Sequence, residues 1–177
     1  QNPGVDPSIP AVLAILPLRG VVVYPLTAVP LTVGQPRSMK LIDDASVGQR
    51  VIGLLTSQNA DIESPGPDDL FRMGTAAQVH RLFRSADGTI RLLVQGLARF
   101  RVEEFVATEP YLRARISLTP ESAEADSLEL EALMRSVTER FQRFAELVPS
   151  MPAELFTAAL SVDDPRQLAY GVANYIR

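Results

Sequence analysis

The apolar residues of this 177-residue chain change their spacing once, near Thr119, and that change limits what the chain can form. Before it, short runs rich in β-branched residues alternate with Gly, Pro and Asp, which is typical of a small twisted sheet or barrel. After it, Leu130, Met134, Val137 and Phe141 recur at intervals of three and four residues, which is the stripe of an amphipathic helix. The spacing therefore predicts a β-rich lobe followed by a helical lobe.

Six strands and one helix are predicted in the β-rich lobe. The strands cover residues 12–18, 28–33, 51–56, 73–83, 89–105 and 112–118. The helix runs over residues 36–45, because Pro36 suits a first helical turn and Gly48 can end the segment. The segment Ser-Ala-Asp-Gly at residues 85–88 predicts an antiparallel hairpin between the fourth and fifth strands, since Asp-Gly tolerates the positive φ of a tight turn.

Three helices are predicted in the C-terminal lobe. The first is expected to begin with a capping box of Asp126 and Glu129. The second opens at Ser150, and the third has Asp164 as its N-cap with Pro165 behind it. No glycine or capping residue follows the last helix, so we expect the chain to be cut inside that element.

These boundaries give a loose leader over residues 1–10, a β lobe over 11–119 and a helical lobe over 120–177. The leader lacks the basic and apolar regions of a signal peptide. The longest apolar stretch, residues 21–31, contains two prolines and is shorter than the roughly 20 residues that a membrane helix needs. The absence of cysteine fits a reducing compartment. We expect a cytoplasmic protein that does not interact with membranes.

Catalytic, cofactor-binding and metal-binding residues are not predicted. Lys40 is the only lysine and follows Met39, so the chain lacks the Gly-Lys-Ser/Thr of a phosphate-binding loop. Ser38 lies two residues from Lys40 on a predicted helix, where the two side chains do not face each other, which argues against a Ser-Lys dyad. His80 is the only histidine, and the sequence supplies no second ligand or partner for it.

Two segments could present apolar groups to another protein. Tyr24, Pro25 and Leu26 lie in a run whose prolines limit pairing in a sheet. A long polar loop ends in Leu70 and Phe71, and long loops in compact domains are usually functional or disordered. We interpret these five residues as a hydrophobic, protein-binding surface, and core packing is the alternative for the first three.

A basic surface is the second candidate. The net charge is −4, but residues 72–118 contain eight arginines and four acidic residues. Strand alternation places Arg99, Arg101, Arg113 and Arg115 on an outward face, where they could bind nucleic acid or an acidic protein segment. The alternative is a solvated sheet face in which acids such as Glu103 pair across the strands.

Five segments, in the same order, resemble the N-terminal domain of Lon-type ATP-dependent proteases. The resemblance begins with Ile-Leu-Pro-Leu-Arg-Gly-Val-Val-Val-Tyr-Pro at residues 15–25 and Val-Pro-Leu-Thr-Val-Gly at 29–34. It continues through Pro-Asp-Asp-Leu-Phe-Arg-Met-Gly-Thr at 67–75, the hairpin at 87–99 and the helix start at 163–169. These segments together extend over nearly the whole chain.

The resemblance implies an α+β fold, a PUA-like pseudo-barrel followed by a helical bundle. It also implies that the domain binds unfolded or degron-bearing proteins and passes them to ATPase and Ser-Lys protease domains outside this chain, where ATP and Mg²⁺ would act. The full-length protein would be a hexamer, and this chain alone a monomer or weak dimer. The alternatives are a stand-alone Lon-domain binding protein and a PUA-like nucleic-acid-binding module.

Overall fold

The computed structural model describes residues 9–121, 127–148 and 162–176. The chain divides into two compact units, Gln1–Pro120 and Glu121–Arg177. Most of the expected leader lies outside the described residues. Ile9, however, is buried in a core cluster, so the part of the leader prediction that includes this residue is wrong.

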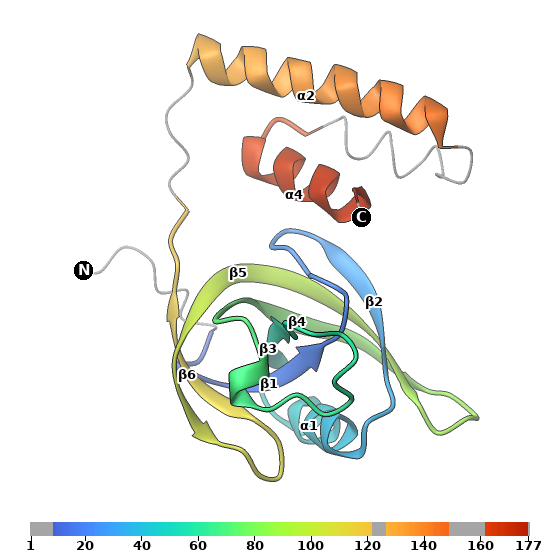
Figure 1. Cartoon of the computed structure of the whole chain (residues 1–177), viewed down its shortest axis with the longest axis vertical. Helices are drawn as coiled ribbons and strands as arrows, with labels where there is room; N and C mark the ends of the chain where they lie inside the picture. Colours follow the sequence, from blue (N-terminus) through green and yellow to red (C-terminus); the bar gives the residue numbers. More distant parts are fainter. Residues whose placement is uncertain (1–8, 122–126, 149–161, 177) are drawn as a thin grey trace. The chain divides into compact units, whose positions relative to one another are not determined.

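The first unit is a mixed sheet that closes into a barrel (Figure 1). Its strands are β1 Val12–Leu18, β2 Ala28–Val33, β3 Val51–Thr56, β4 Met73–Arg84, β5 Ile90–Ala107 and β6 Arg113–Leu118. The order is β2-β5-β4-β3-β1-β6, and β6 also pairs with β5, which closes the barrel and leaves β2 on the outer part of β5. Only the β1–β3 pair is parallel among these strands.

The long strand β5 can pair with both β2 and β6 because it bends. Its first half pairs with β2 and its second half with β6, while β4 pairs along much of its length. The registers shift between Val79 and Arg81 on β4 and between Val102 and Glu104 on β5. Such bulges increase the local twist, which lets one strand serve two sides of a barrel.

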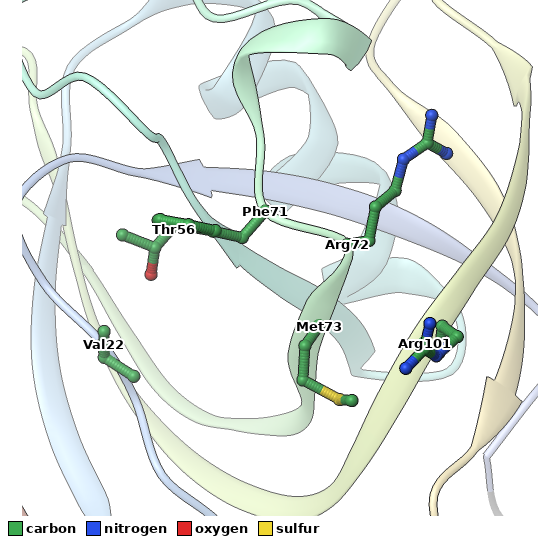
Figure 2. A pocket seen from close by; sticks show the side chains of 6 residues that line it. All are labelled: Val22, Thr56, Phe71, Arg72, Met73 and Arg101. Atoms are coloured by element: carbon green, nitrogen blue, oxygen red, sulfur yellow. The ribbon is translucent and has the colours of Figure 1, made fainter.

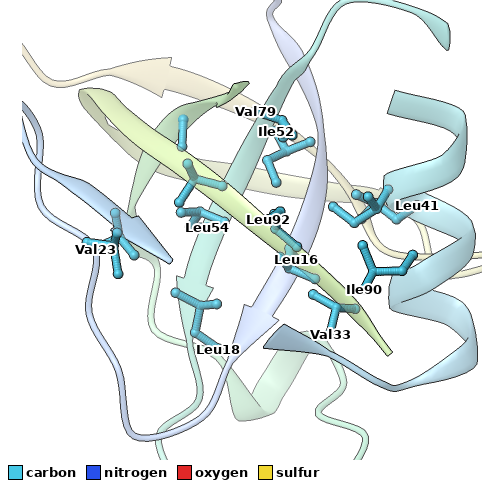
Figure 3. Close-up of a cluster of buried hydrophobic side chains, with 14 residues drawn as sticks. Leu16, Leu18, Val23, Val33, Leu41, Ile52, Leu54, Val79, Ile90 and Leu92 are labelled. Carbon is cyan, nitrogen blue, oxygen red and sulfur yellow. The ribbon is translucent and has the colours of Figure 1, made fainter. Parts of the chain in front are cut away.

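Two hydrophobic clusters lie on opposite faces of β1. Leu16 belongs to the cluster shown in Figure 3, which also includes Leu41 from helix α1 (Pro36–Val47). Ile15, the preceding residue, belongs to a second cluster around Phe100. Adjacent strand residues point to opposite faces, so β1 is buried on both sides. This burial explains why Val12–Leu18 reads as an almost continuous apolar run.

The predicted elements of this unit are confirmed, and no boundary differs by more than two residues. Pro36 occupies the first turn of α1, and Gly48 is its C-cap. In the hairpin turn Gly88 has φ of 85°, and its N–H donates to the Ser85 carbonyl oxygen at 3.0 Å. The α+β class predicted from the sequence is thus confirmed.

The second unit contains helices α2 (Leu128–Leu147) and α4 (Pro165–Tyr175). Asp164 caps α4 as predicted. The cap of α2 is Ser127, whose Oγ accepts from the Leu130 N–H at 3.1 Å, so the predicted capping box with Glu129 is wrong. With Ser127 as the N-cap, the third helical residue is Leu130 and not Glu129, and a leucine side chain cannot complete a capping box. Asp126 and the helix predicted from Ser150 lie outside the described residues.

Phe141 on α2 packs against Tyr175 on α4, with ring centroids 6.1 Å apart. Phe141 and Leu168 are the buried apolar residues of the described parts of this unit. The helices described by the structure contain no segment that is both long and apolar enough to cross a membrane.

Candidate functional site

The segment between β1 and β2 crosses the sheet without joining its ladder. Thr56 at the end of β3 donates its hydroxyl proton to the Val21 carbonyl oxygen, and Thr75 on β4 donates to the Val23 carbonyl oxygen, both at 2.7 Å. Threonine side chains therefore satisfy carbonyl groups that a neighbouring strand would otherwise satisfy. These two hydrogen bonds hold the segment in place, and the side chain of Val22, which lies between the two bonded residues, is exposed to water.

Gly96 on β5 lets the end of this segment lie directly on the strand. A Cβ at this position would lie 2.2 Å from the Tyr24 carbonyl oxygen, so no larger residue fits without movement of the backbone. The Leu26 N–H donates to the Gly96 carbonyl oxygen at 3.0 Å, and the Gly96 N–H donates to Thr27 at 2.9 Å. Leu26 has φ of 61°, a conformation that costs a non-glycine residue roughly 1–2 kcal/mol.

A hollow of about 420 Å³ opens beside this segment (Figure 2). Its apolar lining comes from Val22, Phe71 and Met73, whose exposed fractions are 45%, 52% and 38%. Thr56, Arg72 and Arg101 complete the lining. Exposed apolar side chains from two segments of the chain, Val22 from one and Phe71 and Met73 from the other, thus form one surface. Exposed apolar groups that lie together mark an interaction site better than scattered ones do.

Phe71 faces outward because its neighbour Leu70 faces inward. The Phe71 N–H donates to the Thr56 carbonyl oxygen at 3.0 Å, and Leu70 forms an isolated bridge with Ser57. Leu70 is 1% exposed and packs in the cluster around Phe100. In extended backbone consecutive side chains point in opposite directions, so only one of the two can reach the surface.

The predicted hydrophobic surface is therefore only partly assembled. Phe71 lines the hollow, whereas Leu26 is 42% exposed but is not among its lining residues. Tyr24 is partly buried. Leu70 and Pro25 are buried, so we correct their role from contact residues to supporting ones.

Sequence reasoning missed Val22 and Met73, although a signal was present. Alternation about a buried Val23 would have placed Val22 outward. Met73 lies two residues after Phe71, and residues two apart in extended backbone share a face, so the prediction made for Phe71 could have been extended to Met73.

The four predicted arginines do not form one continuous basic face. Arg101 is paired with Ser117 at one end of the β5–β6 ladder, and Arg113 is paired with Ala107 at the other. Arg99 is partly buried. Arg115 forms an ion pair with Glu104.

The expected acid, Glu103, accepts a hydrogen bond from Ser117 instead of pairing with an arginine. The bulge between Val102 and Glu104 places the next carboxylate opposite Arg115. Arg115 therefore fits the alternative interpretation of these arginines, in which they lie on a solvated sheet face and pair with acids on the neighbouring strand.

Arg101 differs from the other arginines because it lines the hollow. It lies opposite Met73 in the β4–β5 ladder and is exposed. The guanidinium of Arg72 lies 5.5 Å from the centroid of the Phe105 ring, and Figure 2 shows it pointing away from Val22 and Met73. Arg101 is therefore the cation that is available at the apolar surface.

The other titratable residues considered in the sequence have structural partners. Lys40 donates to Asp44 at 2.7 Å, and this hydrogen bond raises the pKa of Lys40 and lowers the pKa of Asp44. Tyr111 also donates to Asp44, and partial burial raises the pKa of Tyr111. His80 is exposed and lies 3.2 Å from the Gln95 side-chain oxygen. Within the described residues, no three potential metal ligands lie together.

The family model for the "ATP-dependent protease La (LON) substrate-binding domain" matches residues 12–177. The chain is 47% identical to Lon protease 1 of Herpetosiphon aurantiacus, covering 96% of this chain and 21% of the relative. It is 44% identical to Lon protease of Dictyoglomus thermophilum, covering 93% of this chain and 21% of the relative. The chain thus spans about a fifth of the length of these relatives.

Two solved structures have a similar fold. One is a Lon N-terminal domain protein from Xanthomonas campestris, with a TM-score of 0.58 and 24% identity over 92% of this chain and 97% of that one. The other is the N-terminal domain of Mycobacterium avium complex Lon protease, with a TM-score of 0.58 and 16% identity over 93% of this chain and all of that one. At these identities the two structures bear on the fold alone.

Proposed function

Because this chain belongs to the family of Lon (protease La) substrate-binding domains, we propose that it binds unfolded or degron-bearing proteins and delivers them to ATPase and protease domains outside the chain. The ATPase domain would bind ATP and Mg²⁺, and the protease domain would cleave the substrate. We assign no residue in the described part of this chain to either step.

The hollow lined by Val22, Phe71 and Met73 is the surface we propose for substrate binding. The observation that supports it is that these side chains remain exposed although they lie on or beside well-packed strands. Unfolded proteins have in common exposed apolar side chains, not a shared sequence. A small apolar hollow can receive such a side chain from many different proteins.

The proposed partners follow from membership of the Lon substrate-binding domain family. They are unfolded proteins, the rest of a Lon chain and, in a full-length protein, other copies in a hexamer. We propose that the 177-residue chain alone is a monomer or weak dimer in solution and that the full-length protein acts in the cytoplasm. The relatives at 47% and 44% identity are named as proteases, which does not favour a stand-alone binding protein or a nucleic-acid-binding module.

The experiment measures binding of the chain to a reduced and alkylated protein that cannot refold. Phe71→Ser is expected to weaken binding by about 1–2 kcal/mol, which is typical for loss of one well-placed apolar contact. The control is Phe83→Ser, because Phe83 is 62% exposed in the same unit but does not line the hollow. Equal binding by the wild type and Phe71→Ser would show that substrate binds elsewhere.

A further inference from the structure

We propose that Arg101 makes the hollow selective for an apolar side chain that has a carboxylate beside it. The inference rests on the proposed function and adds a substrate class to it. The occupant is an extended segment of an unfolded protein with one apolar side chain in the hollow and one carboxylate at its rim.

The position of Arg101 supports this selectivity. The residue lies opposite Met73 on the neighbouring strand and lines the same hollow as Phe71. A side chain that enters the hollow therefore brings its neighbouring residues within reach of the guanidinium. Because Arg101 is exposed, it is open to a partner from solution.

The charge of Arg101 is not balanced locally. In the described part of the chain, no carboxylate lies within salt-bridge distance of Arg101. The nearest acids along its own strand have other partners, since Glu103 accepts from Ser117 and Glu104 pairs with Arg115. Arg101 at the edge of the apolar hollow is therefore complementary to a ligand in which an anionic group lies next to an apolar side chain.

A carboxylate is the anionic group that matches this site in an unfolded protein. The planar guanidinium presents donors in a fork that fits the two carboxylate oxygens. Water is excluded from the apolar side of the pair when the hollow is filled, which strengthens the attraction over that of a fully exposed pair. The carboxylate can belong to an Asp or Glu side chain or to the C-terminus of the segment.

The test titrates fluorescently labelled ten-residue peptides with the 177-residue chain up to about millimolar concentration, because one apolar contact and one ion pair give a Kd of roughly 1 mM or weaker. One pair of peptides has a central Phe followed by Asp or by Asn, both with amidated ends. A second pair ends in Phe-Ala with a free carboxylate or an amide. The first pair tests a side-chain carboxylate and the second tests a C-terminal one.

We expect the chain to bind at least one carboxylate peptide about threefold to fivefold more tightly than its neutral partner, in the upper range of partly exposed ion pairs. Arg101→Gln should remove that difference while leaving affinity for the neutral peptides unchanged. Arg91→Gln is the matched control, because Arg91 is exposed on the same strand but does not line the hollow. It should retain the difference, and thermal melts verify that both variants fold.

Equal affinity for both members of both pairs would overturn the proposal, and so would a preference that survives in Arg101→Gln. A preference lost equally in Arg91→Gln would show an effect of overall charge and would also overturn it. In these cases a dependence of neutral-peptide binding on Phe71 would leave the proposed function standing. If neither the peptides nor an unfolded protein binds, the proposed function itself fails.

Discussion

The adjacent residues Leu70 and Phe71 offer a strict test of which side chains support the barrel and which contact a partner. Leu70 is 1% exposed and packs against the cluster around Phe100. Truncating such a residue to Ala removes buried carbon atoms and leaves a cavity, which costs about 2–5 kcal/mol. Phe71 is 52% exposed, so about half of its ring already contacts water. Full burial of Phe stabilises by about 1.5–3 kcal/mol, so Phe71→Ala should cost only ~1 kcal/mol.

Urea unfolding followed by circular dichroism measures the difference. With a slope of about 2 kcal/mol per molar urea, Leu70→Ala should lower the midpoint by ~1.5 M and Phe71→Ala by ~0.5 M. In the binding assay with an unfolded protein the order should reverse, since folded Leu70→Ala retains the hollow and Phe71→Ala does not. If Phe71→Ala is destabilised as much as Leu70→Ala, the ring supports the fold and the assignment of the hollow is refuted.

Three further predictions concern the backbone and a helix cap. Gly96→Ala should destabilise the barrel by about 1–3 kcal/mol and weaken substrate binding, because its Cβ meets the Tyr24 carbonyl oxygen at 2.2 Å; unchanged urea midpoints would contradict this. Leu26→Gly should be more stable than Leu26→Ala, because only glycine adopts φ of 61° without strain. Both variants lose the isobutyl group of leucine, so the difference between their melting temperatures reports the backbone strain. Arg166 lowers the pKa of Asp164 to about 2, so the carboxylate stabilises α4 above pH ~4 and loses this effect as the pH falls toward 2. Asp164→Ala should therefore cost about 1 kcal/mol at pH 7 and less at pH 2, measured from the helical signal on heating.

The elements of the barrel could be predicted because their signals are local. β-branched runs, the Asp-Gly turn and the proline at the start of α1 each act within a few residues, and each was confirmed. The α2 cap was misplaced by one residue because Ser127 offers a hydroxyl beside a plausible acidic cap. Two neighbouring residues with similar capping ability are not separated by a sequence pattern.

The candidate site could be predicted only in part because it depends on register. Phe71 and Arg101 were both named, but as members of two different surfaces. Their meeting follows from the pairing of β4 with β5, which places Met73 opposite Arg101. The one-residue bulge on β5 likewise decides that Glu104, not Glu103, pairs with Arg115. A shift of one residue moves a side chain to the other face, and the sequence alone does not set that shift.

The size of the hollow limits how a substrate can be held. Burying one aromatic side chain stabilises a complex by about 1.5–3 kcal/mol, and one partly exposed ion pair adds up to about 1 kcal/mol. Micromolar binding requires about 8 kcal/mol, so a single apolar contact with Arg101 beside it is insufficient.

An unfolded chain carries many such side chains, and several copies of the domain in one assembly would engage it at once. Linked weak contacts can exceed either single affinity by 10²–10⁴-fold without new interactions. Weak and broadly selective contacts at each hollow are thus compatible with firm capture of unfolded proteins by the proposed hexamer, and with release of folded ones, which present few apolar side chains.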